Sequence, residues 1–315
     1  MLDLNKPSTQ WLLLFFLALT WGSSFILMKK GLLSYSHDQV ASLRIVISFV
    51  FLSPVIIRNF KKIKRNQWGK LFIAGILGSG LPAFLFPLAQ TQISSSLTGM
   101  LNSLVPLFTV LLGIVFFKMP VRWMKIIGVL VGLGGAIGLV FNSGASAAEN
   151  KNIWYAGLVV LATICYATNV NFIKNSLKEI NSINITSFGF LFIGPAAGVY
   201  LFTTDFTTIL TTNDEAPLHL MYIALLAIFG TAIAVILFNM LIKRVSAVFA
   251  SSVTYIIPVF AIFWGFLDGE RIGIMQLLFI GIILIGVYIV NKDNRLERKE
   301  EKESAEAKKV KESVA

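Results

Sequence analysis

The sequence has few charged residues and almost no cysteine or histidine, and each shortage excludes a class of protein. The single cysteine, Cys165, excludes a disulfide framework and a cysteine-ligated metal centre. The two histidines, His37 and His219, share no metal-ligand spacing, so neither a metal nor another cofactor is expected. Only 14% of the 315 residues are charged, against roughly 25% in soluble domains, whereas 56% are hydrophobic. This composition indicates a membrane protein.

Acidic residues are missing from a long stretch of the first half. No Asp or Glu occurs between Asp38 and Glu149, and those elsewhere fall in loops, at span ends or in the C-terminal tail. Proton-coupled carriers commonly use a membrane-embedded carboxylate that changes charge during the cycle. The shortage therefore favours a facilitator or exchanger over a carboxylate-driven antiporter. It also leaves no paired carboxylates, nucleophile with its base, or metal ligands for an intramembrane enzyme.

Long apolar runs divide the chain into ten candidate membrane helices. A spanning helix needs about 20 mostly apolar residues, and continuous apolar runs favour helices over the alternating strands of a barrel. The predicted segments are 10–28, 39–57, 69–90, 95–117, 123–141, 153–173, 183–203, 218–241, 245–267 and 272–291. We therefore predict an all-α integral membrane protein whose short connections form one compact bundle.

The basic residues predict how this bundle is oriented. A net charge of +11 suggests nucleic acid in a soluble protein, but here the lysines and arginines fall between apolar runs, and no nucleic-acid partner is expected. With a cytoplasmic N-terminus, 22 of the 27 Lys and Arg residues lie inside, four lie outside and Arg44 lies within a span. Without the tail the division is 14 to four. The positive-inside rule therefore predicts a multi-pass inner-membrane protein with both termini cytoplasmic.

The second half of the chain repeats the first. A shift of 152 positions places Gly78 on Gly230, Pro106 on Pro258 and Lys118 on Glu270, and a shift of 145 places Trp21 on Tyr166 and Lys29 on Lys174. Such self-similarity indicates a duplicated unit. We expect repeats at 1–145 and 146–291, followed by a charged cytoplasmic tail at 292–315. Since five spans per repeat is an odd number, the second repeat enters the membrane from the opposite side. Inverted repeats recur in secondary transporters.

These features resemble the EamA-type transporters of the drug/metabolite transporter superfamily over nearly the whole chain. The residues that carry the resemblance are Trp21-Gly22, Lys29, Arg44, the run from Ala250 to Pro258, and Gly269-Glu270-Arg271. The resemblance implies export or exchange of small metabolites, often amino acids, through a central cavity between two five-helix repeats. One departure is that the first repeat has Phe117-Lys118-Met119 where such proteins usually have Gly-Glu-Arg.

Arg44 and two symmetry-related pairs are the leading candidates for binding substrate. Burying an arginine is costly unless it reaches a partner or water. Arg44 therefore either holds a substrate carboxylate, extends to the interface, or caps a neighbouring helix. Trp21 and Ser24 share one helical face, as do their equivalents Tyr166 and Asn169. Each pair suits a mostly apolar pocket with a few orienting hydrogen bonds. The alternatives are helix packing for the aromatic rings and a bond to its own helix for Ser24.

Other polar and helix-breaking residues are weaker candidates. Asn102, Asn239 and Tyr255 lie inside spans, where they either contact substrate or make interhelical hydrogen bonds. Pro106 and Pro258 are expected at the centres of equivalent spans, where they kink the helix and could act as hinges. The glycines of the fifth span, from Gly128 to Gly138, favour close helix packing over a homodimer seam, and a monomer is sufficient.

The sequence thus predicts a secondary transporter of small metabolites, with amino acids or related compounds favoured. One embedded arginine is too few for sugar nucleotides or phosphate esters. The alternative is a channel-like or sensory membrane protein without vectorial coupling. That alternative lacks a ring of pore-lining charges and a soluble domain to carry a signal. The expected partners are a small-molecule substrate and the lipid bilayer.

Overall fold

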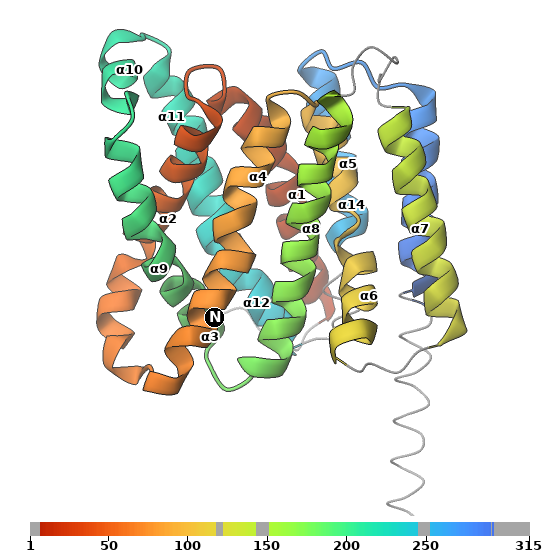
Figure 1. Cartoon of the computed structure of the whole chain (residues 1–315), viewed down its shortest axis with the longest axis horizontal. Coiled ribbons are helices and arrows are strands. Elements are labelled where there is room, and N and C mark those ends of the chain that lie inside the picture. The colour runs from red at the N-terminus through yellow and green to blue at the C-terminus, as the bar shows by residue number, and fades with distance from the viewer. Residues whose placement is uncertain (1–6, 118–121, 143–150, 245–252, 291, 293–315) are drawn as a thin grey trace, which may run out of the picture.

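The computed structural model is a bundle of helices (Figure 1). It describes residues 7–117, 122–142, 151–244, 253–290 and 292, and within these ranges no strand occurs. The first half contains α1 (Pro7–Gly31), α2 (His37–Asn59), η1 (Phe60–Lys62), η2 (Arg65–Gln67), α3 (Trp68–Gly75), η3 (Ile76–Gly80), α4 (Leu81–Gln90), α5 (Ser95–Asn102), α6 (Val105–Phe117) and α7 (Trp123–Phe141). The second half contains α8 (Lys151–Ser176), α9 (Ser182–Phe202), α10 (Phe206–Thr212), α11 (Ala216–Leu225), η4 (Leu226–Ile233), α12 (Ala234–Arg244), α14 (Val253–Leu267) and a last helix, Ile274–Val290.

Every predicted span coincides with an apolar helix or a run of helices. Eight stretches of the described chain are long and apolar enough to cross a membrane, and Val253–Leu267 and Ile274–Val290 are shorter apolar helices. The first residues of the ninth predicted span, 245–252, lie outside the described residues. Sequence reasoning missed the short α10, whose seven residues contain four threonines and no long apolar run. The all-helical prediction is confirmed.

Two spans lose regular α-helical geometry close to a proline. Pro82 has no N–H to donate, and its ring would clash with the carbonyl four residues earlier in a regular helix. That carbonyl belongs to Gly78, within the π-helical segment η3. Pro106 is the second residue of α6, and the chain leaves the helix at Ser103 and Leu104. The fourth span is therefore two helices, and Pro106 begins the second of them instead of kinking the middle of one.

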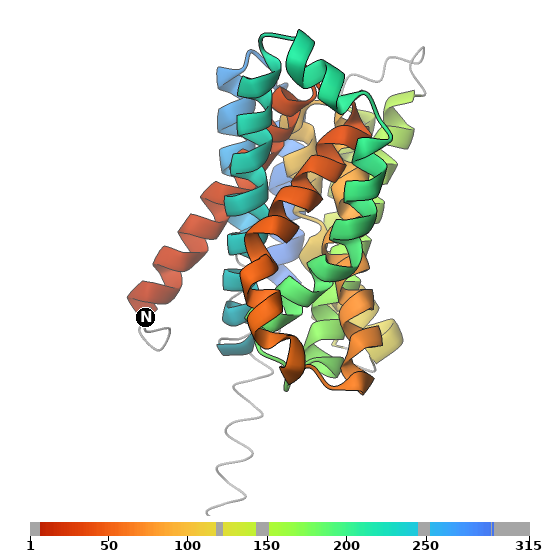
Figure 2. The same ribbon diagram turned by 90° about the vertical axis from the view of Figure 1, so that its left-hand side faces the viewer.

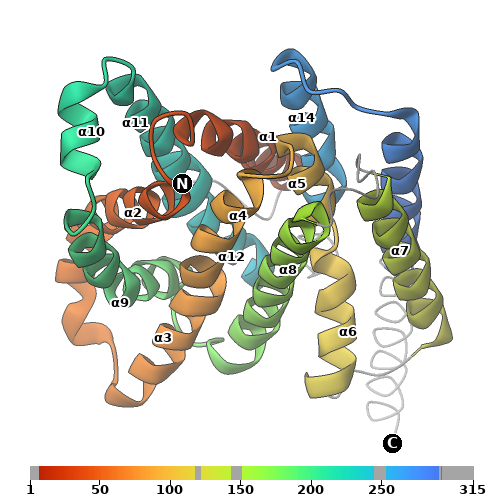
Figure 3. The same ribbon diagram turned by 45° about the horizontal axis from the view of Figure 1, so that its top comes forward.

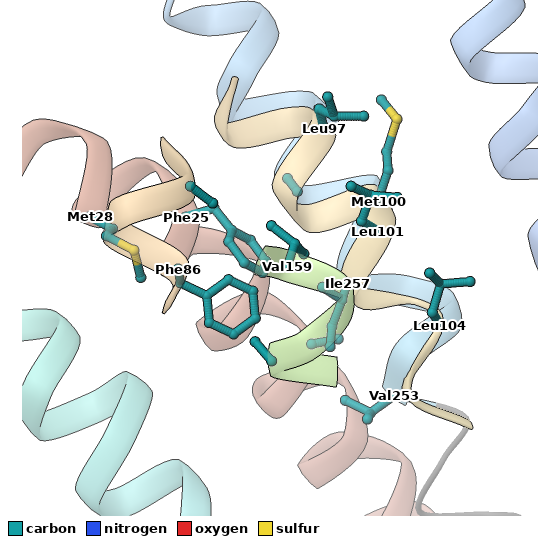
Figure 4. Packing of buried hydrophobic residues seen from close by; sticks show 14 of the residues in the cluster. Phe25, Met28, Phe86, Leu97, Met100, Leu101, Leu104, Val159, Val253 and Ile257 are labelled. Atoms are coloured by element: carbon teal, nitrogen blue, oxygen red, sulfur yellow. The ribbon is translucent and has the colours of Figure 1, made fainter. Parts of the chain in front are cut away.

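The helices pack tightly where side chains are small. A Cβ on Gly22 of α1 would lie 2.9 Å from the Ile257 carbonyl of α14, and one on Gly75 of α3 would lie 2.5 Å from the Gly189 carbonyl of α9. A buried apolar cluster joins α1, α4, α5, α8 and α14, with Phe25 and Phe86 facing each other (Figure 4). The N-terminal half of α1 inclines away from the other helices (Figure 2).

The fifth span and the 274–290 helix form a pair at one end of the bundle (Figure 3). A Cβ on Gly286 would lie 2.5 Å from the Gly132 nitrogen and 2.6 Å from the Gly128 oxygen. Gly135 has a similar contact, with its Cβ position 2.9 Å from the Ile283 nitrogen. Four glycines of α7 therefore pack within the chain, as the sequence analysis favoured, whereas a Cβ on Gly134 would meet nothing within 4 Å.

Candidate functional site

A cavity lies at the centre of the bundle, between helices from both halves of the chain. Its volume is about 120 Å³. Seven of the eight predicted binding residues line it, contributed by α1, α2, α5, α8 and α12: Trp21, Ser24, Arg44, Asn102, Tyr166, Asn169 and Asn239. The eighth, Tyr255, is not among the lining residues. It is a partly buried residue of α14 that packs against the apolar cluster, while its neighbour Thr254 lines the cavity.

Arg44 is the only charged residue among the described residues that line the cavity. Its side chain is buried, and its Nε donates a 2.7 Å hydrogen bond to Thr231 Oγ1 in η4. Thr231 Oγ1 in turn donates to the Leu226 carbonyl at 3.2 Å. The guanidinium also interacts with the Tyr166 hydroxyl. Arg44 therefore points inward, and the alternative in which it extends to the membrane surface does not describe this structure.

The π-helical geometry of η4 provides anchors for this arrangement. In a π-helix the backbone bonds run to the fifth residue, so carbonyls near its ends become available to side chains. Three of them accept from side chains: Leu226 from Thr231, Ala227 from Ser48 at 2.9 Å, and Gly230 from Trp21 Nε1 at 2.9 Å. Sequence reasoning missed Thr231, although the repeat had already marked its neighbour Gly230. The sequence did contain a signal for Thr231, because it directly follows Gly230, a glycine that both repeats share.

Five aromatic rings line the cavity, those of Trp21, Phe25, Phe86, Tyr166 and Phe238. The Trp21 ring makes an edge contact with Phe238, with centroids 4.9 Å apart, and Tyr166 stacks on Phe86 with centroids 5.8 Å apart. Phe25 makes an edge contact with Phe86 at 5.8 Å. Such rings offer apolar surface and π faces to a ligand. The predicted aromatic pair thus lies at the cavity, and Trp21 also makes a helix-packing bond.

The polar side chains in the cavity fall into two groups. Ser24 Oγ donates to the Thr20 carbonyl at 2.8 Å, and Asn239 Nδ2 donates to Thr186 Oγ1 at 3.1 Å, so both serve the helices. Asn102 Oδ1 and Asn169 Oδ1 are buried without a hydrogen-bond partner among the described residues. An unpaired buried carbonyl costs about 1–3 kcal/mol. These two carboxamides are therefore the ones that a ligand or water would satisfy.

The predicted hinge prolines lie close to the cavity. Pro106 follows Val105, which lines the cavity, and Pro258 follows Ile257, which also does. Pro258 is buried within α14, where it removes a backbone hydrogen bond to Thr254, another lining residue. Hinge motion at either position stays a prediction.

The sequence has the signature of a known family over both halves. The model of the EamA-like transporter family matches residues 9–141 and 153–292. The chain belongs to the EamA-like transporter family. The predicted resemblance is confirmed, and the protein is a membrane transporter of small molecules by family.

Several curated relatives of this EamA-like chain are themselves named as transporters. An "uncharacterized transporter" of Archaeoglobus fulgidus is 28% identical over 89% of this chain and 98% of its own length. The "uncharacterized inner membrane transporter YedA" of Escherichia coli is 26% identical over 88% of this chain and 89% of its own length. An "S-adenosylmethionine/S-adenosylhomocysteine transporter" of Chlamydia muridarum is 24% identical over 88% and 90% of the two chains.

The fold of this EamA-like transporter also matches a solved structure. A crystal structure with 15% sequence identity superposes with a TM-score of 0.62 over 93% of this chain and all of its own. At this identity the match shows a shared fold and carries no argument about substrate.

Proposed function

We propose that this protein is a secondary transporter that moves small amphipathic carboxylates, with amino acids favoured, by alternating access through the central cavity. The observation that carries the proposal is Arg44, a buried cation held in place in a cavity whose other described lining residues are uncharged. An uncompensated buried charge is costly, so an anionic or zwitterionic ligand would stabilise it.

The geometry of Arg44 suits a carboxylate. A guanidinium has five N–H donors, and the bond to Thr231 uses the single donor on Nε. The four donors on the two Nη atoms stay available for a bidentate carboxylate, apart from the interaction with Tyr166. One cation matches one carboxylate better than a phosphate ester, which carries more charge.

The rest of the cavity suits the other parts of an amino acid. The buried Oδ1 atoms of Asn102 and Asn169 lack donors, and a substrate ammonium group supplies them. The faces of Trp21, Phe86 and Phe238 suit an apolar or cationic side chain. Because three relatives of this type are named as S-adenosylmethionine/S-adenosylhomocysteine transporters, these compounds belong in the substrate panel.

Reciprocal contacts between the halves support an inverted repeat. A Cβ on Gly230 would meet Ser24, and a Cβ on Gly78 would meet Asn169. The repeat shifts relate Gly78 to Gly230 and Ser24 to Asn169, so each half contributes one glycine and one polar residue to an equivalent contact. The shift of 152 positions also places the π-helical segment η3 within the π-helical segment η4. A site at such an interface is the usual arrangement in alternating-access carriers.

We further propose that transport runs by exchange or facilitated diffusion in an inner membrane, with both termini cytoplasmic. The described lining residues include no Asp or Glu that could change charge during the cycle. Flux measured in liposomes under an imposed pH gradient tests this. Strict dependence of flux on the proton gradient would overturn the exchange mechanism and leave the substrate class intact.

The decisive experiment is counterflow in proteoliposomes preloaded with a mixture of amino acids. We expect uptake in the wild type, and its loss in Arg44→Ala and Arg44→Lys, since lysine cannot make the bidentate contact. Arg58→Ala is the matched control because Arg58 is an exposed arginine at the end of the same helix. Equal uptake by wild type and Arg44→Ala would assign Arg44 to structure. Saturable exchange also distinguishes a carrier from a channel-like protein.

A further inference from the structure

Six exposed basic residues crowd the connection between α2 and α3. No acidic residue accompanies them in the sequence, since none occurs between Asp38 and Glu149. Within the part of the chain that the structure describes, none of the six makes an ion pair. We name these six residues the α2–α3 patch: Arg58, Lys61, Lys62, Lys64, Arg65 and Lys70.

The backbone under the patch is held in place. The short helices η1 and η2 form the connection, and Gln67 Oε1 accepts from the Lys64 nitrogen at 3.0 Å. Asn59 Nδ2 donates to Asn184 Oδ1 of α9 at 2.9 Å. Trp68 packs against the buried apolar cluster beneath the connection. The apolar side of the connection is thus packed inward, and the charges lie on its outer surface.

Apolar side chains that face outward border the patch. Ile57 is 78% exposed, Phe60 is 50% exposed and Phe72 is 47% exposed. At the ends of membrane helices such side chains meet lipid, and aromatic rings favour the level of the headgroups. Basic side chains beside them extend their charges into the same headgroup layer. A phospholipid offers the matching combination, an anionic phosphate next to acyl chains.

The corresponding connection of the second half has the opposite charge. It follows α9, the second span of that half, and covers residues 203–215 with α10. Its charged residues are Asp205, Asp214 and Glu215, and it contains no Lys or Arg. The two connections lie at opposite ends of the bundle (Figure 2). A connection after a second span therefore forms without basic residues, so the charge of the α2–α3 patch is not a requirement of the fold.

The predicted orientation of the chain does not need the patch either. With a cytoplasmic N-terminus and the tail left out, 14 basic residues lie inside and four outside. Without the six residues of the patch, eight inside residues still outnumber the four outside. The positive-inside rule is satisfied by this excess alone. The patch thus has more charge than insertion of the chain requires.

We infer that the α2–α3 patch binds the phosphate headgroups of anionic phospholipids. Clusters of four to eight Lys and Arg residues at the cytoplasmic end of a membrane helix attract such lipids. Arg58 and Arg65 can grip a phosphate with two donors each, and the four lysines add point charges. The inference concerns the lipid alone and is independent of the substrate.

Bound lipid would stabilise two helices that form the central cavity. Arg44 lies on α2, upstream of the patch, and Gly78 and Ser79 of η3 line the cavity downstream of α3. A headgroup that contacts Arg58 at the end of α2 and Lys70 in α3 would join these two helices. A ligand that binds only the folded protein raises its melting temperature, so lipid binding can be measured as thermal stability.

The test is thermal unfolding in a non-ionic detergent with added short-chain lipid. We expect phosphatidylglycerol to raise the melting temperature in a saturable way and phosphatidylcholine at the same concentration to leave it unchanged. Each cation near a membrane surface contributes about fivefold to binding. The variants Lys61→Gln/Lys62→Gln and Lys64→Gln/Arg65→Gln should therefore each weaken the apparent affinity for phosphatidylglycerol about tenfold or more. Their melting temperatures without lipid should match the wild type, since these side chains are exposed and make no ion pair.

Two control variants separate the charge of the patch from other effects. Lys61→Arg/Lys62→Arg keeps the charge and should keep the response. Asp205→Asn/Asp214→Asn/Glu215→Gln changes the charge of the opposite connection and should also keep it. Removal of residues 293–315, which include seven basic and seven acidic residues, should leave the response intact. Loss of the response in that truncated chain would assign lipid binding to the tail and overturn the inference.

Two further results would overturn the inference. The first is an unchanged affinity for phosphatidylglycerol in both glutamine variants, which would show that the patch takes no part in binding. The second is an equal rise in melting temperature with soluble glycerol phosphate, which would show that the patch binds a free phosphate instead of a lipid. Loss of counterflow in Arg44→Ala tests the proposed function separately, because the lipid response is measured without substrate.

Discussion

Ser24 of α1 contacts Gly230 of η4, so closely that a Cβ on Gly230 would lie 2.7 Å from Ser24 Oγ. The contact joins the two halves of the chain at the wall of the cavity. It also fixes the Gly230 carbonyl, which accepts from Trp21 Nε1 one turn earlier on α1. The absence of a side chain at Gly230 therefore lets both Ser24 Oγ and Trp21 Nε1 of α1 approach η4 closely.

The first prediction concerns this contact. Gly230→Ala places a Cβ 2.7 Å from Ser24 Oγ, so the Ser24 side chain or α1 itself must move. Overpacking of this kind costs about 1–3 kcal/mol. We expect a lower melting temperature in detergent and loss of counterflow. Gly157→Ala in α8 is the matched control, because a Cβ there meets nothing within 4 Å. That change should leave flux intact and raise stability by up to about 1 kcal/mol. Normal flux in Gly230→Ala would show that the contact can relax.

A second prediction separates the positioning of Arg44 from its charge. Thr231→Val leaves Arg44 Nε without its 2.7 Å partner, whereas Thr231→Ser keeps the hydroxyl. Hydrogen bonds to charged groups contribute about 1.5–3 kcal/mol, so we expect kcat/KM to fall about tenfold to a hundredfold in the valine variant. The serine variant should stay close to the wild type. An equal loss in both would show that the Thr231 hydroxyl alone does not account for the effect, because the serine variant keeps it.

The third prediction is the pH range over which the buried Glu270 carboxylate keeps its contacts with Lys29, Ser95 and Ser96. Burial by itself raises the pKa of Glu270, but the bonds from Lys29, Ser96 and Ser95 outweigh burial and lower the pKa from 4.5 to about 2. A depressed carboxyl pKa contributes stability that is complete above the unfolded value and is lost as pH falls through the folded value. The difference in thermal stability between the wild type and Glu270→Gln, measured in detergent, should therefore stay constant between pH 7 and 5. A difference that shrinks over this range would contradict the prediction.

The fourth prediction concerns the pair formed by α7 and the 274–290 helix. Gly286→Leu drives a side chain into the Gly128 and Gly132 backbone, so we expect a clear loss of thermal stability. Gly281→Leu on the same helix is the control, since a Cβ at that glycine meets nothing within 4 Å. If instead the glycines form a homodimer seam, Gly286→Leu changes the oligomeric state, measured by light scattering in detergent, with little loss of monomer stability.

Much of the binding site could be predicted because repeats constrain one another. Trp21 and Ser24 were identified together with Tyr166 and Asn169 by their shared position in two copies, and all four line the cavity. Arg44 was found from its charge alone. Tyr255 could not be separated from Thr254 in this way, since adjacent residues on a helix point about 100° apart and hydropathy does not fix the rotation of a helix in a bundle. Thr231 was missed for the same reason.

The sequence by itself determined the all-helical fold, the place of the apolar helices and the family, because these depend on the length of apolar runs and on motifs spaced along the chain. Only the tertiary structure decided which side chains meet. The bond from Arg44 to Thr231 spans 187 positions, and the pair of Lys29 with Glu270 spans 241. Such contacts depend on how the helices rotate and cross. The packing of glycines, prolines and π-helical turns sets that geometry, and no local sequence pattern predicts it.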